Sequence, residues 1–206
     1  MNNSVKKIYL PNNFNSTSNA ILETSFSNSV IKDFRYSKES AFVNSSREAQ
    51  MNSTIEQVAL WFLNQATMSH KKLQKLCYYA YCWYIAFYND SEAITEKNTN
   101  EIQVLCPERF QAWIHGPVSL RLYRRYKGYG WRNIPYNPIK PTVSEEIESL
   151  LQQVWDVYGS FSADELESIS HSEQPWKEAR KNVHLGEACA NEISNYDILQ
   201  YYSSLG

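Results

Sequence analysis

The apolar residues of this chain are unevenly distributed, and their pattern changes near residue 50. Residues 1–50 are dominated by Asn and Ser, and the few apolar side chains among them follow no sustained period. Such a segment buries too little apolar surface to offset the entropy lost on ordering. We predict a disordered extension over residues 1–50, in which a short helix near residues 22–34 is the only element we allow for. Met51, just before the first helical pattern, is either a natural translation start or an accidental methionine.

Two helices are predicted between residues 53 and 88. The first begins at Ser53-Thr-Ile-Glu56, a capping box in which serine and glutamate bond each other's free backbone N–H groups. The second can be capped by Ser69 and ends at Asn89. From Leu76 onward it is apolar on nearly every side, which is typical of a helix in the middle of a fold. We therefore expect this helix to be the buried centre around which the others pack.

Residues 89–141 give weaker signals. A polar loop over residues 89–101 precedes two short apolar stretches, residues 101–105 and 110–114, which predict either a small β-hairpin or two irregular passes. Pro117 suits the first turn of a helix, where its missing N–H costs nothing, so we predict a helix from Pro117 to about Lys127. Many turn-forming residues follow and predict a loop.

Four further helices are predicted downstream. Thr142-Val-Ser-Glu145 is a second capping box, and it opens an amphipathic stripe that Gly159 closes. Ser162 and Glu165 form a third capping box, which opens a helix that runs to about Ile169. Pro175 opens another, and residues 195–202 form a last short one. The expected fold is a mainly α, compact single domain over residues 51–206 with a buried central helix, in which one small β-hairpin is an option.

Composition narrows the functional classes. A chain of 206 residues is long enough to form one substantial hydrophobic core. A net charge of −2 and a pI near 6.1 disfavour a protein that coats nucleic acid. The absence of an apolar leader and of paired cysteine spacings predicts a cytoplasmic protein with reduced thiols, and the longest apolar run is too short to span a membrane. Aromatic residues make up 14% of the chain, which suits a ring-rich core and half-buried interfaces.

The residues suggest no catalytic site, metal site or cofactor. The four histidines lack metal-ligand spacing, and the chain contains no phosphate loop, nucleophile elbow or dinucleotide motif. We assign His115 and His171 structural roles beside helix starts. The alternative is a hydrolase in which one of them pairs with Ser119, Ser172 or Glu173, although sequence spacing does not establish the hydrogen bond that such a base needs.

One basic, aromatic-rich stretch is the best candidate contact surface. Arginines and large rings are the residues most often found as binding hot spots, because rings fill pockets and guanidinium groups pair with carboxylates. We expect Leu120 and Tyr123 to face the core and the charges to face solvent, where an acidic partner would suit them. The alternatives are a solvated face and a phosphate-binding face. The candidate contact residues are Arg121, Arg124, Arg125, Lys127, Tyr129 and Trp131.

Four segments together resemble the Panacea domain, a family also called SocA-like or GepA-like. They are residues 68–84, residues 110–126, residues 158–166 and residues 171–180, and the resemblance extends over about residues 51–206. It implies a fold and a way of binding partners more than any catalytic residue. The positions that we read as the scaffold of these motifs are Trp113, His115, Gly116, Pro117, Tyr123, His171, Pro175 and Trp176.

Many members of this family are bacterial or phage antitoxins paired with a toxin from a neighbouring gene. The resemblance therefore implies an antitoxin that neutralises a cognate protein toxin by direct contact, without enzymatic activity, cofactor or membrane. It also implies a second role as an adaptor that delivers the toxin to a protease, as in the SocA branch. The alternative is a nucleic-acid-binding regulator of phage or toxin–antitoxin genes that uses the basic helix over residues 117–127.

Overall fold

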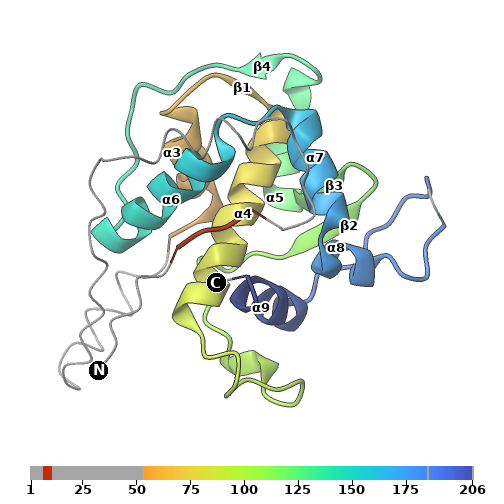
Figure 1. Cartoon of the computed structure of the whole chain (residues 1–206). Helices are drawn as coiled ribbons and strands as arrows, with labels where there is room; N and C mark the ends of the chain where they lie inside the picture. The colour runs from red at the N-terminus through yellow and green to blue at the C-terminus, as the bar shows by residue number, and fades with distance from the viewer. Residues whose placement is uncertain (1–6, 11–52, 185, 206) are drawn as a thin grey trace.

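The structure, a computed structural model, describes residues 7–10, 53–184 and 186–205 (Figure 1). The predicted helix near residues 22–34 and Met51 lie outside these residues. The described chain is mostly helical, with two small two-stranded sheets, and this confirms the predicted fold class. No helix in the described ranges is both long and apolar enough to cross a lipid bilayer.

Helix α4 (His70–Tyr88) is the central element, as its sequence predicts. Every residue from Leu73 to Ile85 is buried, and Ser69 caps the helix by accepting a hydrogen bond from the Lys72 N–H at 3.2 Å. In Figure 1, α4 runs through the middle of the molecule with other helices on its sides. They are α3 (Ile55–Leu63), α6 (Glu145–Tyr158), α7 (Ala163–Ser172) and α9 (Asn195–Ser203).

Stacked and hydrogen-bonded rings make up much of the core around α4. Tyr79 stacks on Tyr158 of α6 with ring centroids 4.0 Å apart, and the Trp83 indole N–H donates to the Tyr158 hydroxyl at 3.2 Å. Tyr158 in turn donates to the carbonyl of Tyr9 at 3.0 Å, and Ile8 is buried in the same core. The first contacts with the helical domain are therefore made well before residue 50.

A tight hairpin follows the loop after α4, and it corrects our prediction for Pro117. Strand β2 (Phe110–Trp113) pairs antiparallel with β3 (Gly116–Ser119), so Pro117 lies in a strand and residues 101–105 are not the hairpin partner. Gly116 has φ +91°, a backbone conformation that glycine adopts readily. The following helix, α5 (Leu120–Tyr126), begins only after Ser119, whose hydroxyl accepts from the Leu122 N–H.

The second sheet holds the loop after α5 against the start of α4. Strand β1 (Met68–Ser69) pairs antiparallel with β4 (Asn133–Ile134). Two short 3₁₀ turns, η1 (Thr99–Glu101) and η2 (Lys127–Tyr129), interrupt the loops. In Figure 1 the segment that carries β4 crosses the top of the molecule and leads to α6.

Helix starts were predicted with mixed success. Ser162 and Glu165 form the expected capping box of α7, and Pro175 lies in the first turn of α8 (Gln174–Ala179). Two predicted caps are wrong by one or two residues, because the box before α3 is formed by Thr54 with Gln57, and Ser144 caps α6. Gly159 ends α6 with φ −65°, without the left-handed conformation of a glycine cap.

Candidate functional site

The predicted contact residues lie on α5, on η2 and on the loop that follows. Leu122 and Tyr126 are the buried residues of α5, so our expectation that Leu120 and Tyr123 face the core is wrong, because both are only half-buried. The remaining positions of α5 are available to solvent, and Trp131 is 91% exposed. We call this set the basic aromatic surface: Arg121, Arg124, Arg125, Lys127, Tyr129 and Trp131.

The charges of the basic aromatic surface differ in their partners. Arg121 lies 3.6 Å from a Glu56 oxygen and 3.7 Å from a Glu108 oxygen, so it also ties α5 to neighbouring elements. Arg125 donates from Nε to the Tyr126 hydroxyl at 3.2 Å. Within the described ranges, Arg124, Arg125 and Lys127 form no ion pair with a carboxylate. Three cations therefore face outward without an anionic partner among these residues.

The sequence around this surface is strongly segregated by charge. Residues 109–144 contain no Asp or Glu. Fixed charges of one sign sum to a field that attracts an oppositely charged partner. Carboxylates from outside the segment pair with Arg109, Arg121 and Lys140, so the local positive potential comes from the cations that form no ion pair in the described ranges. The basic residues of the segment are Arg109, Arg121, Arg124, Arg125, Lys127, Arg132 and Lys140.

The motif residues form one cluster next to the basic aromatic surface. The Trp176 indole donates to the Trp113 carbonyl at 3.1 Å, which joins α8 to the hairpin. His171 stacks on Trp176 with centroids 4.0 Å apart. On the other side, the Trp113 ring packs edge to face against the Tyr123 ring of α5, with ring centroids 4.8 Å apart. Pro175 is buried in α8. These contacts give the motif rings a direct part in positioning α5.

Beneath the hairpin lies a buried lysine that sequence reasoning missed. Lys75 of α4 is 1% exposed and donates from Nζ to the Pro117 carbonyl at 3.2 Å. Burial lowers its pKa to about 7. A Cβ on Gly116 would lie 2.6 Å from Lys75 Cε and 2.8 Å from Ser170 Oγ, so only glycine leaves room for this arrangement. The apolar pattern of α4 gave no sign that a charge is buried there.

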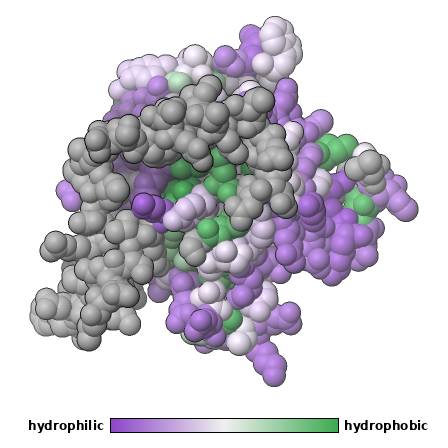
Figure 2. All heavy atoms as spheres, viewed as in Figure 1, coloured by the Kyte–Doolittle hydropathy of each residue, from purple (hydrophilic) through white to green (hydrophobic). Residues whose placement is uncertain are grey.

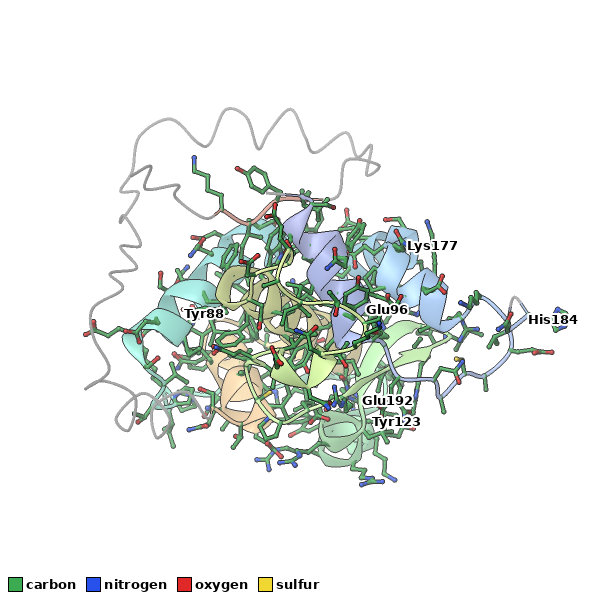
Figure 3. All side chains as sticks on the ribbon, turned by 90° about the horizontal axis from the view of Figure 1, so that it is seen from below. Tyr88, Glu96, Tyr123, Lys177, His184 and Glu192 are labelled. Carbon is green, nitrogen blue, oxygen red and sulfur yellow. The ribbon has the colours of Figure 1, made fainter. Side chains whose placement is uncertain are left out.

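The histidines do not gather into a metal site or a serine–histidine pair. His115 Nδ1 lies 3.2 Å from Glu167 Oε1, and Lys71 forms ion pairs with Glu167 and Asp164. His184 projects at the outer end of the loop after α8 (Figure 3). Groups of three or more potential metal ligands are absent from the described ranges. The partner of His115 is therefore a carboxylate that our sequence analysis did not consider, and the pair links the hairpin turn to α7.

Glu173 occupies the junction between α7 and α8 and is fully buried. The Tyr202 hydroxyl of α9 donates to its Oε2 at 2.8 Å. Burial raises the pKa of this carboxyl to about 8, although the hydrogen bond from Tyr202 favours the charged form. Figure 2 shows a mainly hydrophilic surface on the side of the molecule where α7 and α8 lie. The hydrogen bond joins the junction of α7 and α8 to α9, and Glu173 has no contact with solvent.

One of the three comparisons with known proteins gives a match. A family model described as "Antitoxin SocA-like, Panacea domain" matches residues 73–177, which are 105 of the 206 residues. The matched region begins in α4 and ends in α8, so it contains the hairpin, α5 and the motif cluster. Neither the comparison with curated proteins nor that with solved structures gives a significant match.

Proposed function

The chain belongs to the family of SocA-like antitoxins with a Panacea domain, and from that premise we propose that it neutralises a protein toxin by direct binding. The toxin would be the product of an adjacent gene. The chain would act by occlusion, in which the basic aromatic surface covers the part of the toxin that does harm. Affinity in such interfaces is concentrated in a few buried rings and arginines.

The observation that carries this proposal is the outward-facing charge and ring content of α5 and its following turn. Arg124, Arg125 and Lys127 are exposed without a carboxylate partner in the described ranges, and Trp131 is almost fully exposed. A solvent-exposed tryptophan adds little to the stability of a monomer. In an interface, its large ring contributes buried area and its indole N–H can donate a hydrogen bond. Complementary carboxylates on the toxin would steer association and fix orientation.

The proposal is tested by coexpression. Cells that express the adjacent gene's product should stop growing, and the full chain should restore growth and copurify with that product. The double variant Arg124→Glu/Arg125→Glu should lose both effects, because the glutamates that replace the arginines repel an acidic surface. Lys7→Glu/Lys97→Glu, at two exposed lysines outside the basic aromatic surface, is the matched control because it changes the net charge by the same amount, and it should behave as the wild type. Absence of both rescue and copurification with the wild-type chain would refute the proposal.

We propose delivery of the toxin to a protease as a secondary role, because the resemblance to the SocA branch implies an adaptor. A chain that only occludes the toxin leaves its half-life unchanged, whereas an adaptor shortens it. The toxin's half-life in growing cells, with and without the full chain, separates these two modes.

Nucleic-acid binding is the second candidate function, and the acid-free segment over residues 109–144 is the observation that favours it. Affinity would then fall steeply with salt, because each phosphate contact releases counterions. Arg124→Ala and Arg125→Ala would each lower the affinity and the steepness of its salt dependence. Binding of duplex DNA that is insensitive to salt and to both substitutions would eliminate this function.

A further inference from the structure

The loop between η2 and α6 displays an unusual concentration of exposed apolar side chains. The described residues include five exposed large hydrophobic residues, and three of them lie within nine positions of this loop. Trp131 is 91% exposed, Ile139 74% and Tyr136 52%. Clustered exposed apolar residues on a soluble domain mark interaction sites more often than chance placement does. We call these three residues the apolar loop.

The apolar loop is held in place by a series of hydrogen bonds to the helical domain. Ile134 is buried, and its carbonyl accepts from the Thr67 hydroxyl at 2.8 Å. Three residues further on, the Asn137 N–H donates to the Leu63 carbonyl at 2.8 Å, and the Asn64 side chain donates to the Asn137 carbonyl at 2.8 Å. The backbone between the exposed side chains is therefore fixed at both Ile134 and Asn137.

The fixed backbone lowers the cost of binding. A loop that is already ordered loses less conformational entropy when a partner binds than a flexible loop does. Asn137 also bonds its own neighbourhood, because its side-chain nitrogen donates to the Ile139 carbonyl at 2.7 Å. The three apolar side chains are thus presented to solvent by a backbone whose polar groups are largely bonded to the protein.

The charge around the apolar loop indicates the chemistry of its partner. The loop lies within the acid-free segment, and Arg132 is exposed beside Trp131. Lys140 follows Ile139 and forms an ion pair with Glu148, so part of the positive charge at this end is compensated. In Figure 1 the segment that carries β4 runs across the top of the molecule. The apolar loop shares Trp131 with the basic aromatic surface, so the two sets of residues are adjacent along the chain.

We propose that the apolar loop is the hydrophobic half of the toxin interface, and that it binds a protein surface with apolar recesses bordered by carboxylates. This inference rests on the proposed antitoxin function and extends it to Tyr136 and Ile139. A protein occupant fits better than a nucleic acid, because an aliphatic side chain such as Ile139 offers no face for base stacking and no group that pairs with phosphate. Interfaces of this kind combine an apolar centre with a polar, charged rim.

Site-specific photo-crosslinking in living cells tests the proposal with the full chain. A photoreactive amino acid replaces Ile139 or Tyr136 in cells that also express the adjacent gene's product. Gln152, exposed on α6, is the control position. The expected result is a crosslink to that product from positions 139 and 136 and none from position 152. In parallel, Tyr136→Ser/Ile139→Ser should weaken copurification at least tenfold and leave the melting temperature unchanged, because both side chains are exposed.

The possible outcomes separate this inference from the function on which it rests. Rescue and copurification without crosslinking at positions 136 and 139, and without an effect of the double serine variant, would overturn the role of the apolar loop and leave the antitoxin function intact. A chain that neither rescues growth nor copurifies with the product would overturn the antitoxin function, and this inference with it. Crosslinking to nucleic acid in place of the product would also overturn the inference.

Discussion

Glu173 and Lys75 show how individual residues of this fold depend on their surroundings. Both side chains are normally charged at neutral pH, and both are almost completely buried in the folded protein. A sequence pattern records polarity and spacing, but the burial of a charge is decided by elements that meet only in the folded chain. Our sequence analysis considered Glu173 only as an imagined catalytic partner, and the structure gives it a structural hydrogen bond to Tyr202.

The buried carboxyl of Glu173 should make stability depend on pH. Its pKa is about 8 in the folded chain and 4.5 in the ordinary case. Between these values the folded state holds a proton that the unfolded state has released, so this group makes the free energy of unfolding fall as pH rises. Between pH 5 and 7 the contribution of Glu173 to this fall should be about 2 kcal/mol. His70 and His171 contribute with the opposite sign over the same range, because burial lowers the pKa of each imidazole. Lys75, with a folded pKa of about 7, stays protonated in both states over most of that range and contributes little.

The variant Glu173→Gln keeps an acceptor for the Tyr202 hydroxyl and removes the titration. Urea unfolding at several pH values measures the free energy of unfolding of both proteins, and relative to this variant the wild type should lose about 2 kcal/mol between pH 5 and 7. Glu187→Gln, at an exposed loop position, should retain the wild-type pH dependence. Identical pH dependence in the wild type and Glu173→Gln would show that Glu173 is not a buried acid.

At the scale of elements, local signals placed most helices and misplaced the hairpin. Ser162 with Glu165, and Ser69 before α4, cap helices as their sequences predict. Pro117 was read as a helix start because proline suits that position. The chain uses Pro117 in strand β3, where its carbonyl accepts a hydrogen bond from the buried Lys75. This contact with α4 joins distant segments, so no local pattern contains it.

Gly116 offers a direct test of the hairpin. Gly116→Ala should destabilise the protein by about 2–4 kcal/mol, because φ +91° disfavours a side chain and the new Cβ would collide with Lys75 and Ser170. Gly128→Ala is the matched control, since nothing lies within 4 Å of its Cβ position. Thermal or urea unfolding measures both variants. Equal stability of Gly116→Ala and Gly128→Ala would contradict the packing described here.

At the scale of the whole molecule, the sequence predicts a helical domain around α4 but not what attaches to it. The predicted extension was treated as free of the core, whereas Tyr158 bonds to the carbonyl of Tyr9, 149 positions earlier in the chain. The candidate surface shows the same limit. The exposed residues of α5 could be named from their types, but the ion pairs of Arg121 and the ordered apolar loop follow from contacts between distant segments.

The contact of Tyr158 with the amino-terminal segment can be tested by removing one hydroxyl. Tyr158→Phe deprives the Tyr9 carbonyl of its donor and leaves the buried Trp83 N–H without this acceptor, which should cost about 1–3 kcal/mol of stability. Trypsin should also cleave after Lys7 faster than in the wild type. Tyr136→Phe, at an exposed tyrosine, should change neither property. Unchanged cleavage after Lys7 in Tyr158→Phe would show that this hydroxyl does not hold the segment.

The central claim is that the chain works by binding a toxin through the basic aromatic surface. The most direct measurement is the dissociation constant of the purified full chain with the adjacent gene's product, determined by calorimetry at low and high salt. The account predicts a specific complex that weakens with salt, and that weakens at least tenfold in Arg124→Glu/Arg125→Glu while the melting temperature stays at the wild-type value. A complex of undiminished affinity in this variant, or no complex with the wild-type chain, would contradict it.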